Sequence, residues 1–180
     1  MKTLFIMAAL ISIFSRPPHD IDFGKNASGE KWVLINDNVM GGKSAGSFDV
    51  EDYYLHFTGK TSLENNGGFS KIRSENIDLK LDATDEITIR LKGDGRKYTF
   101  LFDTSVLFFR PSYWHDIQTK EGEWQEIKIK TTDFYQTKMG KPTGKNISKR
   151  KLKKVKRIGF IIYDKKPGPF DLKIDYIRFK

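Results

Sequence analysis

The chain contains no cysteine among its 180 residues. Disulfides, thiolate metal sites and cysteine nucleophiles are therefore all excluded, while the cellular compartment stays open, because a cysteine-free protein is stable in any redox environment. Histidine is scarce as well. The three histidines, His19, His56 and His115, show neither the H-x-H nor the H-E-x-x-H spacing that assembles a transition-metal site, so we expect no such metal.

Long apolar runs are also missing. The longest, Leu4 to Phe14, follows Lys2 and has eleven residues, whereas a membrane-spanning helix needs about 20. It fits the core of a secretory signal peptide, although no A-x-A pattern accompanies the small residue Ser15. We therefore expect residues 1–15 to be a signal peptide, the mature chain 16–180 to have no transmembrane segment, and the protein to be exported, either periplasmic or secreted. The alternative is a first buried strand in a protein that stays inside the cell, in contact with a membrane or not.

No window of a dozen residues carries a sustained apolar stripe at helical spacing, and no internal repeat is visible. The dominant period is two, which is typical of half-buried strands. A segment apolar on both faces, 158–163, is expected to be central in its sheet. Many short strands separated by Gly, Asp, Asn and Pro turns predict an all-β sandwich, in one domain over residues 16–180. The clearest strands are predicted at 53–58, 86–92, 98–103, 124–130, 158–163 and 172–179.

Two glycine-rich stretches stand out, NDNVMGGKSAGSF from Asn36 to Phe48 and SLENNGGFSKIRS from Ser62 to Ser74. Each sets paired glycines among small polar residues and leads into a strand-like run, which predicts tight turns. We expect these loops to form part of a binding surface. The alternative for their acidic residues is a local role, bonding to their own backbone. The candidate contact residues are Asn36, Asp37, Met40, Gly41, Gly42, Ser44, Glu64, Asn65, Asn66, Gly67, Gly68, Arg73 and, beside a third glycine turn, Asp94.

The segment Gly42 to Gly46 matches the G-x-S-x-G pattern of a hydrolase nucleophile elbow, and Gly42-Lys43-Ser44 is similar to the end of a phosphate-binding loop. Both matches lack their context. An elbow needs a helix after the serine, whereas Gly46 leads into a strand, and the phosphate loop needs a glycine where this chain has Asp37. We therefore predict no catalytic residue, Ser44 included.

Aromatic residues crowd the interval around Arg110-Pro111, where a regular strand is not expected. Exposed rings beside an arginine suit a sugar face or an apolar partner segment, and Tyr113 and Trp114 are candidate contacts there. Core packing beneath the loop is the alternative, also for Phe108 and Phe109. Elsewhere, the side chains of Trp32 and Trp124 are expected to be core anchors.

The formal net charge is +9, and much of it is local. Residues Lys149 to Arg157 read KRKLKKVKR, in which seven of nine are basic. This run is either a solvated loop or strand edge, or a docking site for an anionic surface. Nucleic acid is the least expected partner, because we expect the protein to be exported. The basic patch comprises Lys149, Arg150, Lys151, Lys153, Lys154, Lys156 and Arg157.

Several motifs, in one order from about Phe23 to Phe179, resemble the complex I intermediate-associated protein 30 family. The resemblance implies a jelly-roll β-sandwich similar to galactose-binding domains, and a non-enzymatic, chaperone-like assembly factor whose partner is a protein of a larger, respiratory complex I-type assembly. It implies no cofactor. By analogy with carbohydrate-binding jelly rolls, a structural calcium is conceivable, with Asp175 as one ligand. The motifs are Trp32, Asn36-Asp37-x-Val39-Met40-Gly41-Gly42-x-Ser44-x-Gly46-x-Phe48, Phe57-x-Gly59, Ser62 to Phe69, Lys92-Gly93-Asp94-Gly95-Arg96-x-Tyr98, Trp124, Asp133-Phe134, Gly159-Phe160 and Pro167 to Phe170.

Two other functions stay open at this point. One is a carbohydrate-binding module of an exported protein, which the sandwich fold and the signal-like leader favour. The other is binding to an anionic surface or nucleic acid through residues 149–157, which would weaken steeply with added salt.

Overall fold

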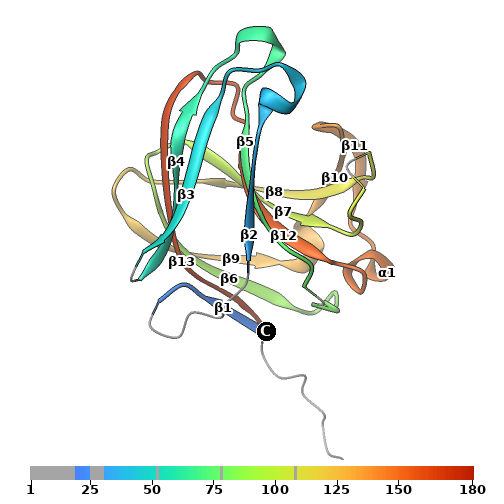
Figure 1. Cartoon of the computed structure of the whole chain (residues 1–180). Helices are drawn as coiled ribbons and strands as arrows, with labels where there is room; N and C mark the ends of the chain where they lie inside the picture. Colours follow the sequence, from blue (N-terminus) through green and yellow to red (C-terminus); the bar gives the residue numbers. More distant parts are fainter. Residues whose placement is uncertain (1–18, 25–30, 52, 78, 108) are drawn as a thin grey trace, which may run out of the picture.

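The computed structural model describes residues 19–24, 31–51, 53–77, 79–107 and 109–180. The predicted leader, residues 1–15, and the interpretation of Phe108 lie outside these residues. The described residues form two antiparallel β-sheets that face each other, with short helices in the connections (Figure 1). The prediction of an all-β sandwich is confirmed.

The first sheet has six strands in the described part of the chain, in the order β3-β4-β13-β6-β9. Strand β1 pairs with the last part of β13, from Tyr176 to Phe179, because the pairing of β4 with β13 ends at Ile174 and leaves this edge of β13 free. The strands are β1 (His19–Asp22), β3 (Ala45–Glu51), β4 (Tyr54–Thr61), β6 (Glu86–Gly93), β9 (Trp124–Lys130) and β13 (Gly168–Phe179).

The second sheet has seven strands among the described residues, in the order β11-β10-β8-β7-β12-β5-β2. Strand β12 lies between β7 and β5, so the prediction of a central position for this apolar segment is confirmed. The strands are β2 (Trp32–Asn36), β5 (Ser70–Ser74), β7 (Lys97–Asp103), β8 (Ser112–Gln118), β10 (Tyr135–Lys138), β11 (Lys141–Asn146) and β12 (Arg157–Ile162).

The core lies between the two sheets and is built by period-two alternation. Phe57 of β4 and Phe100 of β7 are fully buried members of this core, which is rich in aromatic rings. Phe102 stacks on Phe134 with 4.1 Å between ring centroids. Burying such rings contributes about 2 kcal/mol each, so this layer dominates the stability of the sandwich.

Short helices occupy four connections in the described residues. Three are 3-10 turns, η1 (Asp37–Met40), η2 (Glu64–Asn66) and η3 (Thr131–Asp133). The fourth is α1 (Lys149–Leu152), and no helix in the part of the chain described above combines the length and apolar character needed to cross a membrane.

Three sequence interpretations need correction. The interval after Pro111 was expected to lack a regular strand, yet Ser112–Gln118 forms β8, because the proline precedes the paired segment. Trp124 was expected in the core, but its side chain is 39% exposed on the outside of the first sheet, under the guanidinium of Arg90. Tyr113 was a candidate surface contact, but β8 turns it into the core, where it is buried.

Candidate functional site

The two glycine-rich stretches meet at the buried carboxylate of Asp37. Its Oδ1 accepts a hydrogen bond from the Ser44 amide (2.8 Å), and its Oδ2 accepts from the Ser44 hydroxyl (2.6 Å). The Oδ2 atom also accepts from the amides of Gly68 (2.6 Å) and Phe69 (3.2 Å), which belong to the second stretch. One carboxylate therefore joins the two loops, and we call this arrangement the Asp37 clasp.

The clasp explains one glycine in each pair. A Cβ on Gly42 would lie 2.4 Å from the Asp37 Cγ, and one on Gly67 would lie 2.5 Å from the Asp37 Oδ2. Neither distance is possible for real atoms, so any side chain at these two positions would expel the carboxylate. The glycine motif is thus explained by the close approach of the backbone to Asp37.

The ionisation of Asp37 follows from the same contacts. Burial alone would raise its pKa, but hydrogen bonds from Ser44, Gly68 and Phe69 outweigh burial and hold the pKa below its usual value. The carboxylate is therefore charged at neutral pH and bonded to the backbone of both loops.

Other polar contacts join the same loops. Asn36 Nδ2 donates to the Gly46 carbonyl, and its Oδ1 accepts from the Gly46 amide and the Ser70 hydroxyl. Asn65 Nδ2 donates to the Gly41 carbonyl across the two turns. On the exposed surface, Lys43 and Glu64 pair at 2.5 Å, which adds little stability because both are solvated.

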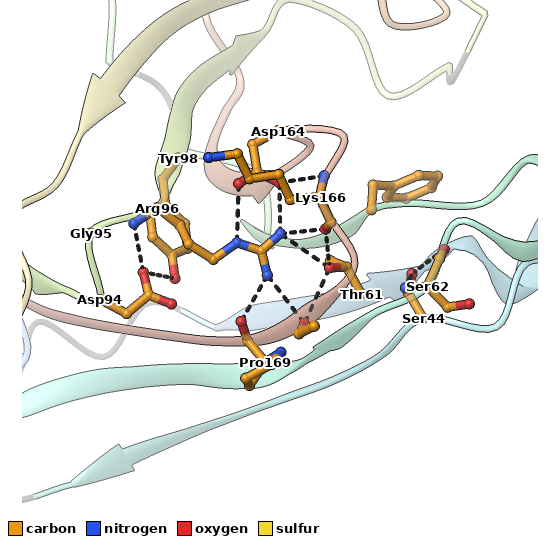
Figure 2. Close-up of polar contacts among 12 residues, drawn as sticks. Ser44, Thr61, Ser62, Asp94, Gly95, Arg96, Tyr98, Asp164, Lys166 and Pro169 are labelled. Carbon is orange, nitrogen blue, oxygen red and sulfur yellow. Dashed lines mark hydrogen bonds and ion pairs between the residues drawn. The ribbon is translucent and has the colours of Figure 1, made fainter.

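A second polar cluster surrounds Arg96, which directly follows the third glycine turn (Figure 2). The guanidinium binds Asp164 through Nε and Nη2, at 3.0 and 2.6 Å. Its Nη atoms also donate to the Thr61 hydroxyl and to the carbonyls of Lys166, Gly168 and Pro169. Every nitrogen of Arg96 is thus satisfied, so this cluster holds the β12–β13 connection and leaves no donor for a ligand.

Asp94 belongs to the same framework. Its carboxylate accepts from the Tyr98 hydroxyl (3.1 Å), the Arg96 amide (3.1 Å) and the Asp171 amide (2.9 Å). This cluster has its own hydrogen-bond partners and adjoins the Asp37 clasp through Thr61 and Ser62, because Thr61 accepts from Arg96 while Ser62 bonds the hydroxyl of Ser44 (Figure 2). Asp37, Glu64 and Asp94 therefore do not line one shared surface. Asp37 is buried, Glu64 is exposed, and Asp94 connects β7 to β13 through its hydrogen bonds.

An open groove of about 550 Å³ lies on the outer face of the seven-stranded sheet, the face turned away from the core. We call it the outer groove. Its floor contains Trp114 of β8 and Ile161 of β12, which with Leu101 form a small apolar cluster separate from the main core. Tyr163 lies edge-on to both Trp114 and Phe69, with ring centroids 6.0 and 6.4 Å apart.

The rim of the outer groove is apolar and exposed. Five of the eleven large apolar side chains that the described residues leave exposed line this groove. The most exposed are Val39 (72%), Met40 (69%) and Met139 (57%). Single exposed apolar residues are ordinary, but five around one hollow mark a contact surface. The five are Val39, Met40, Val106, Leu107 and Met139.

The Asp37 clasp positions one wall of this groove. Val39 and Met40 lie on η1, which begins at Asp37, and Asn66 ends η2 in the second glycine stretch. The opposite wall comes from the β7–β8 loop and from the turn at Met139. The glycine stretches therefore contribute to the surface through their tips, while their centres hold the fold.

The groove is also cationic. Lys71 and Arg73 of β5 line it together with Arg110, whereas Asp103 is the one carboxylate among its described lining residues. Strand pairing sets Arg157 of β12 directly opposite Asp103, on the same face of the sheet. These cations outnumber the acid that faces them.

Two side chains at this face have buried donors without acceptors among the described residues. Trp114 is 9% exposed, and its Nε1 is buried without a hydrogen-bond partner among the described residues. The same holds for Nε and Nη1 of Arg157. Since buried donors without acceptors cost about 1–3 kcal/mol each, they mark places where a ligand can contribute acceptors.

The structure thus places four of the residues expected from the sequence in the groove: Met40, Asn66, Arg73 and Trp114. Sequence reasoning missed Lys71, Asp103 and the rim residues Val106 and Met139. Lys71 could have been found from the period-two alternation of β5, which places Lys71 and Arg73 together on the face opposite Ile72.

The basic run behaves differently from the groove. Lys149–Leu152 forms α1, and Leu152 and Val155 anchor the segment in the core. Five of the other basic side chains of the run are exposed and Lys151 is half-buried. Arg157 differs because it begins β12, where it is half-buried in the sheet opposite Asp103. The exposed patch therefore excludes one of the seven predicted members.

Ser44 shows no nucleophile–base pairing within the part of the chain that the structure describes. Ser44 donates to Asp37, and no hydrogen bond between described residues joins a serine to a histidine. No group of three or more His, Cys, Asp or Glu that could hold a metal is found within the described ranges. Asp175 pairs with Arg90, which would compete with a cation for that carboxylate.

Comparison with solved structures shows the fold. The chain is similar to a family 11 carbohydrate-binding module of a Clostridium thermocellum cellulosomal cellulase, with a TM-score of 0.63 and 13% identity over 91% of this chain and 95% of that one. A family 11 module from the same organism, in complex with a beta-1,3-1,4-mixed-linked tetrasaccharide, gives 0.60 and 14% over 89% and 94%. The predicted jelly-roll sandwich resembling galactose-binding domains is thereby confirmed.

Sequence comparison identifies the relatives. The mouse (Mus musculus) protein named complex I intermediate-associated protein 30, mitochondrial, is 26% identical over 169 residues, which cover 82% of this chain and 51% of the mouse protein. The chain thus spans about half the length of this curated relative. The model of the complex I intermediate-associated protein 30 family matches residues 21–174, and the chain therefore belongs to that family.

Proposed function

We propose that this chain is a non-enzymatic binding domain that assists the assembly of a larger protein complex, like a chaperone, by holding a segment of a partner protein in the outer groove. The family and the name of the mouse relative favour a complex I-type assembly as the larger complex. The observation that carries the proposal is the ring of exposed apolar side chains around a hollow in an otherwise charged surface.

The chemistry of the rim favours a polypeptide. Methionine and branched aliphatic side chains adapt to apolar protein surfaces, and Met40 and Met139 both line this groove. Burying such side chains contributes about 1.5–3 kcal/mol each when they are covered fully, which is ample for a specific contact. A rigid sandwich beneath them limits the entropy lost on binding.

The test is site-specific photocrosslinking in the native cell. We replace Val106, at the rim, with a photoreactive benzoylphenylalanine, and we replace Val50 as the matched control. Val50 is a similarly exposed valine (54% against 46%) on β3, outside the groove. Discrete crosslinked proteins are expected from position 106 only. Identical products from both positions, or none from position 106, would refute the proposal.

A carbohydrate-binding function is the second candidate, and the similarity to family 11 modules favours it. An aromatic floor containing Trp114 and Tyr163 suits a sugar. However, sugars stack on open ring faces, and Trp114 is 9% exposed with Tyr163 edge-on to it. Calorimetric titration with a glycan panel tests this candidate: saturable binding that Trp114→Ala removes would support it, and flat titrations would retire it.

A further inference from the structure

The charges of the outer groove are out of balance. Asp103 accepts a hydrogen bond from the Ser112 hydroxyl (2.7 Å) and lies 3.9 Å from the Arg73 guanidinium. It is the one acid there, and it also faces Lys71 and Arg157. A single carboxylate, already engaged, therefore serves three partly buried cations.

The same cations have spare donors. The Lys71 ammonium makes no hydrogen bond or ion pair with the residues that the structure describes, and Arg157 has two buried guanidinium nitrogens without acceptors. Burial lowers the pKa of Lys71, and the nearby charges of Arg73 and Arg157 lower it further, against the opposing effect of Asp103. The surroundings also lower the pKa of Arg73, chiefly through burial, so the site disfavours the charges of Lys71 and Arg73, and an added anion would stabilise them.

The surroundings of the cations are apolar. Strand pairing sets Lys71 between Ile35 of β2 and Ile161 of β12, and both isoleucines line the groove. An anion that reaches Lys71 therefore also contacts these isoleucines, and this favours an anion on an apolar carrier over a strongly hydrated free anion.

We propose that Lys71 and Arg73, which line the outer groove, and Arg157, which lies opposite Asp103 on the same face of the sheet, form an anion subsite. This subsite receives an aspartate or glutamate side chain carried by an apolar segment of the partner protein. This inference rests on the proposed function and specifies the partner's chemistry. Apolar residues of the segment cover the rim, and its carboxylate supplies the acceptors that the cations lack. Such a charge-assisted contact gives specificity and register to an otherwise non-directional apolar contact.

The experiment is selection from a random peptide library on the immobilised whole protein, wild type and Lys71→Met. The wild type is expected to enrich apolar peptides with Asp or Glu at one position. An enriched peptide is then compared with its Asn or Gln counterpart. The acidic form should bind the wild type about tenfold tighter or more, and Lys71→Met should reduce this preference to about twofold.

Controls separate the subsite from the groove and from general charge. Lys128→Met removes an exposed lysine on β9, in the other sheet, and should keep the full acidic preference. Lys71→Met should fold, since it removes a disfavoured charge, and Arg73→Gln serves as a second variant. Apolar peptides without acidic preference would overturn the subsite and leave the groove in place. Enrichment of no peptide would overturn both proposals, and an equal loss in Lys128→Met would overturn the subsite.

Discussion

Replacing Asp37 with asparagine tests the clasp without changing its size. The carboxylate accepts four hydrogen bonds, three on Oδ2 and one on Oδ1. An amide has one acceptor oxygen, and the best orientation keeps that oxygen at the Oδ2 position. The amide nitrogen then faces the backbone N–H of Ser44, so two donors point at each other in a buried site.

The cost can be worked out from these contacts. Leaving the buried Ser44 amide without an acceptor costs about 1–3 kcal/mol. The three remaining bonds lose the assistance of a charge, about 1 kcal/mol each, although such contributions are not additive. We expect Asp37→Asn to lower the free energy of unfolding by about 3–5 kcal/mol, against a typical total of about 5–15 kcal/mol.

Urea denaturation followed by tryptophan fluorescence measures this loss. Asp49→Asn is the matched control, because Asp49 is exposed on β3 beside the first glycine stretch, and its change should stay within about 0.5 kcal/mol. In Asp37→Asn the midpoint should fall while the denaturant dependence stays constant. A loss of less than about 1 kcal/mol would show that the clasp does not hold the two loops, and the explanation of Gly42 and Gly67 would fail with it.

Three further predictions follow from the same structure and a fourth from the sequence. Arg96→Lys should lower the free energy of unfolding by about 2–4 kcal/mol in urea, because a lysine cannot reproduce the fork-shaped contact with the nearly buried Asp164. Lys71→Met should raise the free energy of unfolding by about 1 kcal/mol at neutral pH, because it removes a charge that burial disfavours. This gain should shrink as pH rises toward 10.5, the pKa of the lysine in the unfolded chain, because the wild-type lysine then becomes neutral in both states. The penalty of Asp37→Asn should be constant above about pH 5 and should shrink as pH falls below 3.8, through the lowered pKa of Asp37. The last prediction comes from the sequence: mass spectrometry of the protein from cell fractions should find a mature chain that begins at Arg16. Its formal charge should be +8, which is the +9 of the full sequence less the one charge of Lys2.

Much of the fold could be predicted from the sequence, because alternation reports directly on half-buried strands. All six strands expected from that period are present, including β12 and β13. Strands such as β2 and β10 are short and lack a clean alternation, so only their pairing with neighbours reveals them. The family resemblance of the glycine motifs predicts the type of fold, a jelly-roll sandwich.

The binding surface was harder to predict, because alternation assigns residues to two faces without saying which face meets the core. Tyr113 and Trp114 are adjacent aromatics, and only the sheet shows that the first turns inward and the second outward. Arg157 ends a basic run in the sequence and belongs to another surface in space. The groove combines strands far apart along the chain, which no local pattern reports.

Structural residues and candidate binding residues of this domain differ in how many of their hydrogen-bonding groups have partners within the fold. Asp37 and Arg96 have every acceptor or donor engaged within the fold, so a partner could bind them only by breaking the structure that presents it. Lys71 and Arg157 keep unused donors at a cost in stability, which a folded protein tolerates where another molecule completes the site. Asp37 and Arg96, which the family motifs contain, therefore hold the scaffold. Under the proposed function, partner specificity resides in the groove cations and in the apolar rim, to which the same motifs contribute Val39 and Met40.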